Sequence, residues 1–178
     1  MSDLETERLL MRKFRREDVD DMYEVASDEK VAEYSDFSRH TSKDDTLMSI
    51  ECAIRDYGTY ESCWAIEEKE SHKAIGYIRV LNASLKNKQC SLIWAIGQKY
   101  WGLGYSEEIL KTMFKFLFEE HTFDIIIVKY YNDHAFSNYI LENVGMKRDA
   151  ILRDRRINSL TGKKEALVVY SILKEEMI

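Results

Sequence analysis

Two glycines at the junction of a predicted strand and a predicted helix constrain this chain more than any other feature. The apolar run at residues 90–96 predicts a strand, and apolar residues at three- and four-residue steps over 109–117 predict an amphipathic helix. Gly102 and Gly104 stand between them, directly before the helix. The first N–H groups of a helix have no internal partner, and glycine lets a ligand approach the backbone closely. The junction therefore predicts a phosphate-binding loop.

The loop resembles one particular cofactor-binding motif. Residues 100–108 read Tyr-Trp-Gly-x-Gly-Tyr-Ser-x-Glu. This order resembles the acetyl-CoA pyrophosphate loop of the GNAT N-acetyltransferases, above all the branch that includes the ribosomal-protein N-terminal acetyltransferases. The family pattern Gln/Arg-x-x-Gly-x-Gly/Ala falls on residues 101–106, with tryptophan at the first position and serine at the last. The resemblance implies that acetyl-CoA is bound by Trp101, Gly102, Leu103, Gly104, Tyr105 and Ser106.

Other phosphate-binding loops fit these residues less well. A Rossmann fingerprint requires a third glycine and a βαβ unit, and neither is found where that motif would place it. A Walker A loop requires Gly-Lys-Ser/Thr, which does not follow the glycines. A generic phosphate-ligand domain that uses only the helix N-terminus stays open as a weaker alternative.

A second motif at residues 133–146 resembles the family's Asn-x-x-Ser…Leu-Glu-Lys-Leu-Gly-Phe helix. Ser137 falls on the serine position, which the resemblance places near the cofactor sulfur. Its hydroxyl either protonates the leaving thiolate as a catalytic residue or only hydrogen-bonds pantetheine. His134 stands where the family usually has asparagine, and an imidazole can donate a hydrogen bond as an amide does. Asn132 is an alternative source of that amide, so we predict cofactor contacts from Asn132, His134 and Ser137.

The strand before the loop supplies a third set of implied contacts. The resemblance implies that backbone groups of Trp94, Ala95 and Ile96 pair with the pantetheine amides. Ser91 occupies a position where relatives often have glutamate, and Ile93 one where they often have glycine. The first departure removes one candidate for the general base.

Acetyl transfer to an amine requires a neutral amine and a proton for the leaving thiolate. Leu141 stands where many relatives outside this branch have a tyrosine that acts as the general acid. Its absence here makes Ser137 the stronger candidate for that role. No carboxylate is an evident general base. Glu165, Glu142 and Asp36 are candidates through a water molecule, and alternatively the amine loses its proton before it binds.

The segment before the central strands is predicted to be helical. Asp28 predicts the N-cap of a short helix to about residue 34, and Thr41 or Ser42 predicts the N-cap of a longer helix to about residue 57. In the resembling family this region forms one wall of the acceptor site. The candidate substrate-binding residues are therefore Tyr34, Asp36 and Phe37.

The order of predicted elements is a strand, helices, three antiparallel strands, a helix, a strand, a helix and two strands. The last two strands are predicted at residues 152–157 and 165–173. The β-branched run at residues 125–128 is typical of a strand buried on both faces. We therefore predict an α/β fold, a single domain over residues 1–178 with a mixed, mostly antiparallel central sheet and helices on both faces. The resemblance further implies that the fourth and fifth strands splay apart, with pantetheine in the gap.

Charge and cysteine content limit the partners. Twenty-six basic and thirty-two acidic residues give a net charge of −6, which argues against a nucleic-acid partner and is compatible with a cationic acceptor. The three cysteines show no metal-ligand spacing, so we predict no metal and a cytoplasmic location. The sequence shows no signal-like or membrane-spanning apolar run, so we predict no membrane partner. A monomer and a homodimer both stay open.

These observations lead to one main hypothesis. The chain is predicted to be an acetyl-CoA-dependent N-acetyltransferase that modifies a primary amine, on a protein N-terminus or a small molecule, by direct attack in a ternary complex. The alternative is a catalytically silent acyl-CoA binding or sensing module, which the departures at Ser91, Ile93, His134 and Leu141 motivate.

Overall fold

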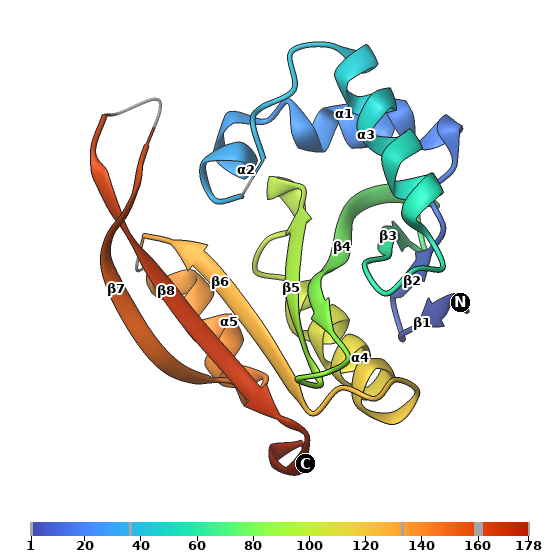
Figure 1. Ribbon diagram of the computed structural model, residues 1–178. Helices are drawn as coiled ribbons and strands as arrows, with labels where there is room; N and C mark the ends of the chain where they lie inside the picture. The colour runs from blue at the N-terminus through green and yellow to red at the C-terminus, as the bar shows by residue number, and fades with distance from the viewer. Residues whose placement is uncertain (1, 36, 133, 159–161, 178) are drawn as a thin grey trace.

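The computed structural model describes residues 2–35, 37–132, 134–158 and 162–177. One mixed sheet runs through these residues in the order β1-β2-β3-β4-β5-β6-β8-β7 (Figure 1). Its strands are β1 (Leu4–Glu5), β2 (Leu9–Arg12), β3 (Cys63–Glu68), β4 (Lys73–Ser84), β5 (Gln89–Ile96), β6 (Ile125–Tyr131), β7 (Lys147–Ile157) and β8 (Lys164–Leu173). The helices are α1 (Val19–Ala26), α2 (Glu29–Glu33), α3 (Lys43–Asp56), α4 (Tyr105–Glu119) and α5 (Ala135–Asn143), with short 3₁₀ turns at Arg16–Asp18, Gln98–Tyr100 and Lys174–Glu176.

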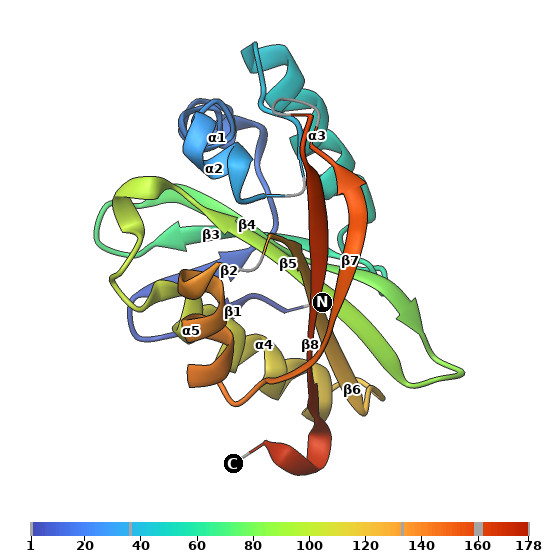
Figure 2. The same ribbon diagram turned by 90° about the vertical axis from the view of Figure 1, so that its left-hand side faces the viewer.

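The sheet is antiparallel except at one pair of neighbours, β5 and β6. Helices α1, α2 and α3 lie on one face of the sheet, and α4 and α5 lie on the other (Figure 2). The predicted α/β class, the mixed and mostly antiparallel sheet and the helices on both faces are therefore confirmed. Among the described residues, no helix is both long and apolar enough to cross a membrane.

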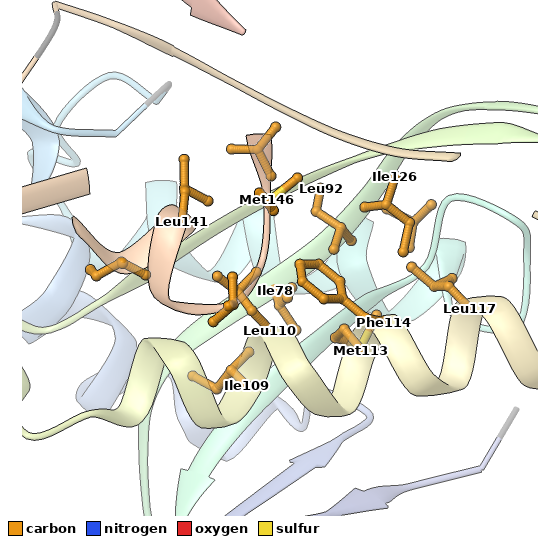
Figure 3. Packing of buried hydrophobic residues seen from close by; sticks show 14 of the residues in the cluster. Ile78, Leu92, Ile109, Leu110, Met113, Phe114, Leu117, Ile126, Leu141 and Met146 are labelled. Carbon is orange, nitrogen blue, oxygen red and sulfur yellow. The ribbon is translucent and has the colours of Figure 1, made fainter. Parts of the chain in front are cut away.

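Two apolar clusters hold the layers together, one on each face. The larger cluster joins α4 and α5 to the sheet, and Ile109, Leu110, Met113, Phe114 and Leu117 of α4 point into it (Figure 3). The smaller cluster joins α1, α2 and α3 to the opposite face. Successive side chains of β3 point to opposite faces of the sheet. Trp64 and Ile66 therefore belong to the larger cluster, and Cys63 and Ala65 belong to the smaller one. Such two-sided burial explains the continuous apolar runs in the sequence.

The parallel pair β5–β6 separates before it ends. Residues 89–92 pair with 125–128, and beyond them β5 keeps only its β4 neighbour while β6 keeps only β8. The last residues of both strands, 93–96 and 129–131, therefore border a gap (Figure 1). The predicted order counts one strand where the structure has β1 and β2, so β5 and β6 are its fourth and fifth strands. They are the splayed pair that the family resemblance implied.

The two predicted helix caps are present. The Asp28 carboxylate accepts hydrogen bonds from the backbone N–H groups of Lys30 and Val31, and the Ser42 hydroxyl accepts one from Asp45. These caps fix the start of α2 and of α3, and the end of α2 reaches the gap. Strand β7 is longer than the sequence pattern predicted, because it begins at Lys147 rather than near residue 152.

Candidate active site

The splay between β5 and β6 opens into a cavity of about 500 Å³. Its walls come from both faces of the sheet, since Tyr34 follows α2 on one face and Ser137 lies in α5 on the other. The cavity therefore passes through the sheet at the splay. Seven of the predicted cofactor contacts line it, namely Trp94, Ala95, Ile96, Trp101, Ser106, His134 and Ser137.

A second hollow, of about 310 Å³, lies beside the first and is lined by the whole predicted loop from Trp101 to Ser106. The walls of both hollows include Ile96, Trp101, Ser106, Phe136 and Ile140. A ligand whose phosphates rest on the loop can thus extend an arm into the splay. The structure brings the two predicted motifs, loop and α5, to one continuous space.

The loop is built around two glycines in a left-handed conformation. Gly102 has φ +76° and Gly104 has φ +78°, a region in which a side chain is strained. Gly104 is also the N-cap of α4, and no side chain caps that helix end. A Cβ atom at Gly102 would meet nothing within 4 Å, so the loop backbone is open to a ligand. These exposed N–H groups fit a pyrophosphate.

The N-terminal segment braces this loop, a contact that sequence reasoning missed. Arg8 donates from Nη1 to the Leu103 carbonyl at 2.8 Å and from Nε to Glu108 at 2.8 Å. Glu108 also accepts hydrogen bonds from the Thr6 hydroxyl and from the Arg8 backbone N–H. The segment thereby joins the loop to the first turn of α4.

Two tryptophan indoles fix the surface between the cavities. The Trp94 Nε1–H donates to the Ser106 hydroxyl at 3.2 Å, and the Trp101 Nε1–H donates to the Ile96 carbonyl at 2.9 Å. The loop and the end of β5 are therefore held together as one unit. One lone pair of the Ile96 carbonyl is already used by this bond.

His134 and Ser137 form a local pair at the start of α5. The His134 Nδ1 accepts the Ser137 backbone N–H at 3.3 Å, which makes His134 the N-cap of the helix. Because a backbone N–H can only donate, Nδ1 carries no proton, and a neutral ring then carries its proton on Nε2. That Nε2–H lies 3.3 Å from the Ser137 Oγ and can donate to it. The Ser137 hydroxyl proton is then not spent on His134.

Asn132 is not brought into the cavity. Its amide group donates to Glu165 at 2.8 Å, and it is absent from the described lining residues. Glu165, one of the base candidates, is buried and accepts further hydrogen bonds from Asn158 and Arg156. Burial alone would raise the pKa of Glu165, but the hydrogen bonds from Asn158, Arg156 and Asn132 and the Arg156 charge lower it below its ordinary value. A carboxylate held in this way is a poor proton acceptor.

The remaining base candidates differ in position. Glu142 accepts a hydrogen bond from the Tyr170 hydroxyl at 3.0 Å and is absent from the described lining residues of the cavity. Asp36 lies outside the described residues. Glu33, at the end of α2, is the one acidic residue among the described lining residues of the cavity. Sequence reasoning missed Glu33 because it reads as an ordinary exposed helix residue.

Of the two described candidates for acceptor binding, Tyr34 lines the cavity and Phe37 does not. Tyr34 lies edge-on to His134, with ring centroids 4.9 Å apart, and edge-on to Trp101 at 5.8 Å. It therefore spans the space between the loop and α5. Phe37 instead packs against Tyr77, at 6.3 Å between centroids, and is absent from the described lining residues.

Comparison with known proteins agrees with this geometry. Residues 8–147 match the family model described as an acetyltransferase (GNAT) domain. The chain belongs to the GNAT acetyltransferase family. It is an acyltransferase, and its acetyl donor is acetyl-CoA. The residues above fit that donor, because an open glycine loop adjoins a cavity between splayed strands.

Curated relatives cover nearly the whole chain. An uncharacterized N-acetyltransferase, YoaA, from Bacillus subtilis is 23% identical over 172 residues, which are 96% of each protein. An uncharacterized N-acetyltransferase, p20, from Bacillus licheniformis is 24% identical over 178 residues, 99% of this chain and 98% of that one.

Solved structures share the fold at low identity. An acetyltransferase of the GNAT family from Bacillus anthracis has a TM-score of 0.84 and 22% identity, over 98% of this chain and 100% of that one. RimL, a ribosomal L7/L12 α-N-protein acetyltransferase in complex with coenzyme A, has a TM-score of 0.85 and 14% identity, over 97% and 98%. These neighbours show that the chain shares their fold.

Proposed function

We propose that this enzyme transfers the acetyl group of acetyl-CoA to a primary amine by direct attack while both substrates are bound. The observation that carries the proposal is the continuous space through the sheet. It joins the loop hollow on the α4 side to the opening beside α2 on the other face. Donor and acceptor can therefore reach one point from opposite sides.

Acetyl-CoA, when bound, supplies an acetyl group activated as a thioester. The backbone N–H groups of residues 102–106 would hold its phosphates at the N-terminus of α4. The ends of β5 and β6, which lack each other as partners, would offer backbone groups to its amides. Trp94, Ala95 and Ile96 of β5 are the candidates for these contacts.

Ser137 is proposed as the proton donor to the leaving sulfur. Its hydroxyl lines the cavity, and His134 can hold the oxygen by donating from Nε2. The donated bond leaves the serine proton directed elsewhere, which suits a general acid. Glu33 is proposed to accept a proton from the incoming amine, directly or through water, since it is the carboxylate among the described lining residues.

Cysteine positions favour direct attack over an acetyl-cysteine intermediate. None of the three cysteines is among the described lining residues. Burial raises the pKa of Cys63 to about 12 and that of Cys90 to about 12, so both thiols are poor nucleophiles. Cys52 lies in α3, away from the splay.

The first test is calorimetric binding of acetyl-CoA to the wild type, Gly104→Glu and Gly58→Glu. Gly58 is the control, because its φ of +92° is also positive, a Cβ there would meet nothing within 4 Å, and it lies away from the loop in the turn after α3. We expect Gly104→Glu to weaken acetyl-CoA binding by about a hundredfold or more, since a carboxylate would face the phosphates, and Gly58→Glu to bind within about twofold of wild type. Equal binding by all three proteins would contradict the loop assignment.

The second test measures release of CoA thiol with a panel of primary amines. Direct attack in a ternary complex predicts initial-rate lines that intersect when both substrates are varied. Parallel lines would instead indicate a covalent acetyl-enzyme and would overturn the proposed mechanism. A folded wild type that binds acetyl-CoA but acetylates no amine would overturn the proposed acceptor class.

A further inference from the structure

A buried carboxylate holds an arginine in the wall of the cavity. Glu165 of β8 is only 4% exposed. It accepts hydrogen bonds from the Arg156 Nε at 2.8 Å and Nη2 at 2.6 Å. The amide groups of Asn132 and Asn158 each donate to its other oxygen at 2.8 Å. Four donors thus converge on one carboxylate, from Arg156 in β7 and from Asn132 and Asn158, which directly follow β6 and β7.

The arginine is held on a second side as well. Its guanidinium carbon lies 3.9 Å from the centroid of the Tyr131 ring. Arg156 and Tyr131 both line the cavity, and the Arg156 side chain is 30% exposed. A charged donor group is therefore fixed in orientation at the cavity wall.

The surroundings of Arg156 are strongly basic. From residue 151 to 164 the β7–β8 hairpin carries five basic side chains and one acidic one. The helical layer on the other side of the opening has the reverse charge, with eleven acidic and four basic residues from 19 to 56. Figure 1 shows the hairpin beside the end of β6 and α2 above the gap between the splayed strands. A field of this kind orients a molecule that carries both charges.

We propose that Arg156 binds an anionic group of the acceptor, a carboxylate or phosphate close to the amine that is acetylated, and that Glu165 is its positioning residue. The inference rests on the proposed function, since it names the class of amine that the site takes. Arginine suits this role because its planar donors match carboxylate and phosphate oxygens. Polyamines and aminoglycosides, which are purely cationic, are then poor acceptors.

The test compares acceptors that differ only in the anion. One arm uses short peptides with a free N-terminus and aspartate or glutamate, against the same peptides with asparagine or glutamine. The other arm uses small molecules, amino acids against their amides and phosphoethanolamine against ethanolamine. We expect the wild type to prefer the anionic member by about tenfold or more in kcat/KM, and the better arm distinguishes a peptide from a small acceptor.

Variants assign the preference to one residue. Arg156→Gln should raise KM for anionic acceptors by about tenfold or more and leave neutral amines within about twofold. Arg156→Lys should retain part of the preference, and Glu165→Gln should raise KM for anionic acceptors with little change in kcat. Arg153→Gln is the matched control, because Arg153 is a basic residue of the same hairpin and is absent from the described lining residues of the cavity.

Calorimetry gives a readout that does not depend on turnover or on Arg156→Gln folding well. The CoA-bound wild type and Arg156→Lys would be titrated with the N-acetylated anionic products and with their neutral amides. Equal binding or equal kcat/KM within every pair would overturn the inference. If neutral amines are acetylated as well as anionic ones, the proposed function stands and this inference fails. If no amine is acetylated, the proposed function fails, and product binding alone decides between an anion site and a purely structural Arg156–Glu165 pair.

Discussion

At the scale of single residues, His134 has two separable tasks. Its Nδ1 caps α5 by accepting the Ser137 backbone N–H, and its Nε2–H can donate to the Ser137 hydroxyl. Asparagine and aspartate are both good N-caps, but only asparagine also has an N–H to donate. Substitution by each of them therefore separates the cap from the donor. With aspartate, the Ser137 hydroxyl would donate its own proton to the carboxylate and lose it for the leaving sulfur.

We predict that His134→Asn keeps kcat within about threefold of wild type, while His134→Asp lowers kcat by about tenfold or more. The measurement is CoA release at saturating acetyl-CoA, with thermal unfolding as the check that both variants are folded. In a Ser137→Ala background the difference between the two should vanish, because the residues act as one unit. Equal kcat for the two single variants would contradict the proposed hydrogen bond.

At the scale of elements, the spacing of β4 and β5 depends on one glycine. A Cβ atom at Gly76 would lie 2.1 Å from the Ala95 carbonyl oxygen and 2.8 Å from the Ile96 Cα. Both neighbours are backbone atoms, so the clash can be relieved only if the backbones of β4 and β5 move apart. That stretch of β5 is the one proposed to contact the pantetheine arm. Gly97, which follows it, has an ordinary φ of −56° and would place a Cβ no closer than 3.4 Å to its neighbours.

We predict that Gly76→Ala lowers the free energy of unfolding by about 1–3 kcal/mol and also weakens acetyl-CoA binding. Gly97→Ala, the matched control, should change the free energy of unfolding by less than about 0.5 kcal/mol. Urea unfolding and calorimetric titration check the two effects. A Gly76→Ala variant with native stability and affinity would show that β5 can shift without loss.

The same scale shows what the sequence could predict. Local signals sufficed for the caps at Asp28 and Ser42, and for the strand–loop–helix order at residues 90–117. The start of β7 was missed because residues 147–150 are mostly charged and exposed, which gives an edge strand no apolar alternation. The Arg8–Glu108 brace was missed because it joins residues 100 positions apart, a separation that no local pattern encodes.

At the scale of the whole molecule, two carboxylates join distant parts of the chain. Glu108 joins the N-terminal segment to the loop and α4, and Glu165 of β8 joins Asn132, directly after β6, to Arg156 of β7. For each, burial would raise the pKa, but the hydrogen bonds and nearby arginine charge outweigh it and leave the pKa below the usual 4.5. A carboxylate whose pKa is lowered by folding stabilises the folded state above its unfolded pKa. That stability is lost as the pH falls through the lower, folded-state pKa.

We therefore predict that the free energy of unfolding falls as the pH decreases below about 4.5. Urea unfolding between about pH 7 and pH 3.5 measures the fall. Glu108→Gln and Glu165→Gln should each show a smaller fall than wild type, although both are less stable at pH 7. Glu70→Gln, in the exposed β3–β4 turn, is the control and should keep the wild-type pH dependence. An unchanged fall in both test variants would assign acid sensitivity to other carboxylates.

We also predict that each of the two carboxylates affects the KM of a different substrate. Glu108 acts on the loop through Arg8, so Glu108→Gln should raise KM for acetyl-CoA and leave the acceptor KM near wild type. Glu165 acts on the acceptor opening through Arg156, so Glu165→Gln should do the reverse for anionic acceptors. Steady-state kinetics with each substrate varied at saturation of the other measures both constants. If each variant raised both KM values equally, the two ends of the cavity would be coupled through the sheet rather than built as separate sites.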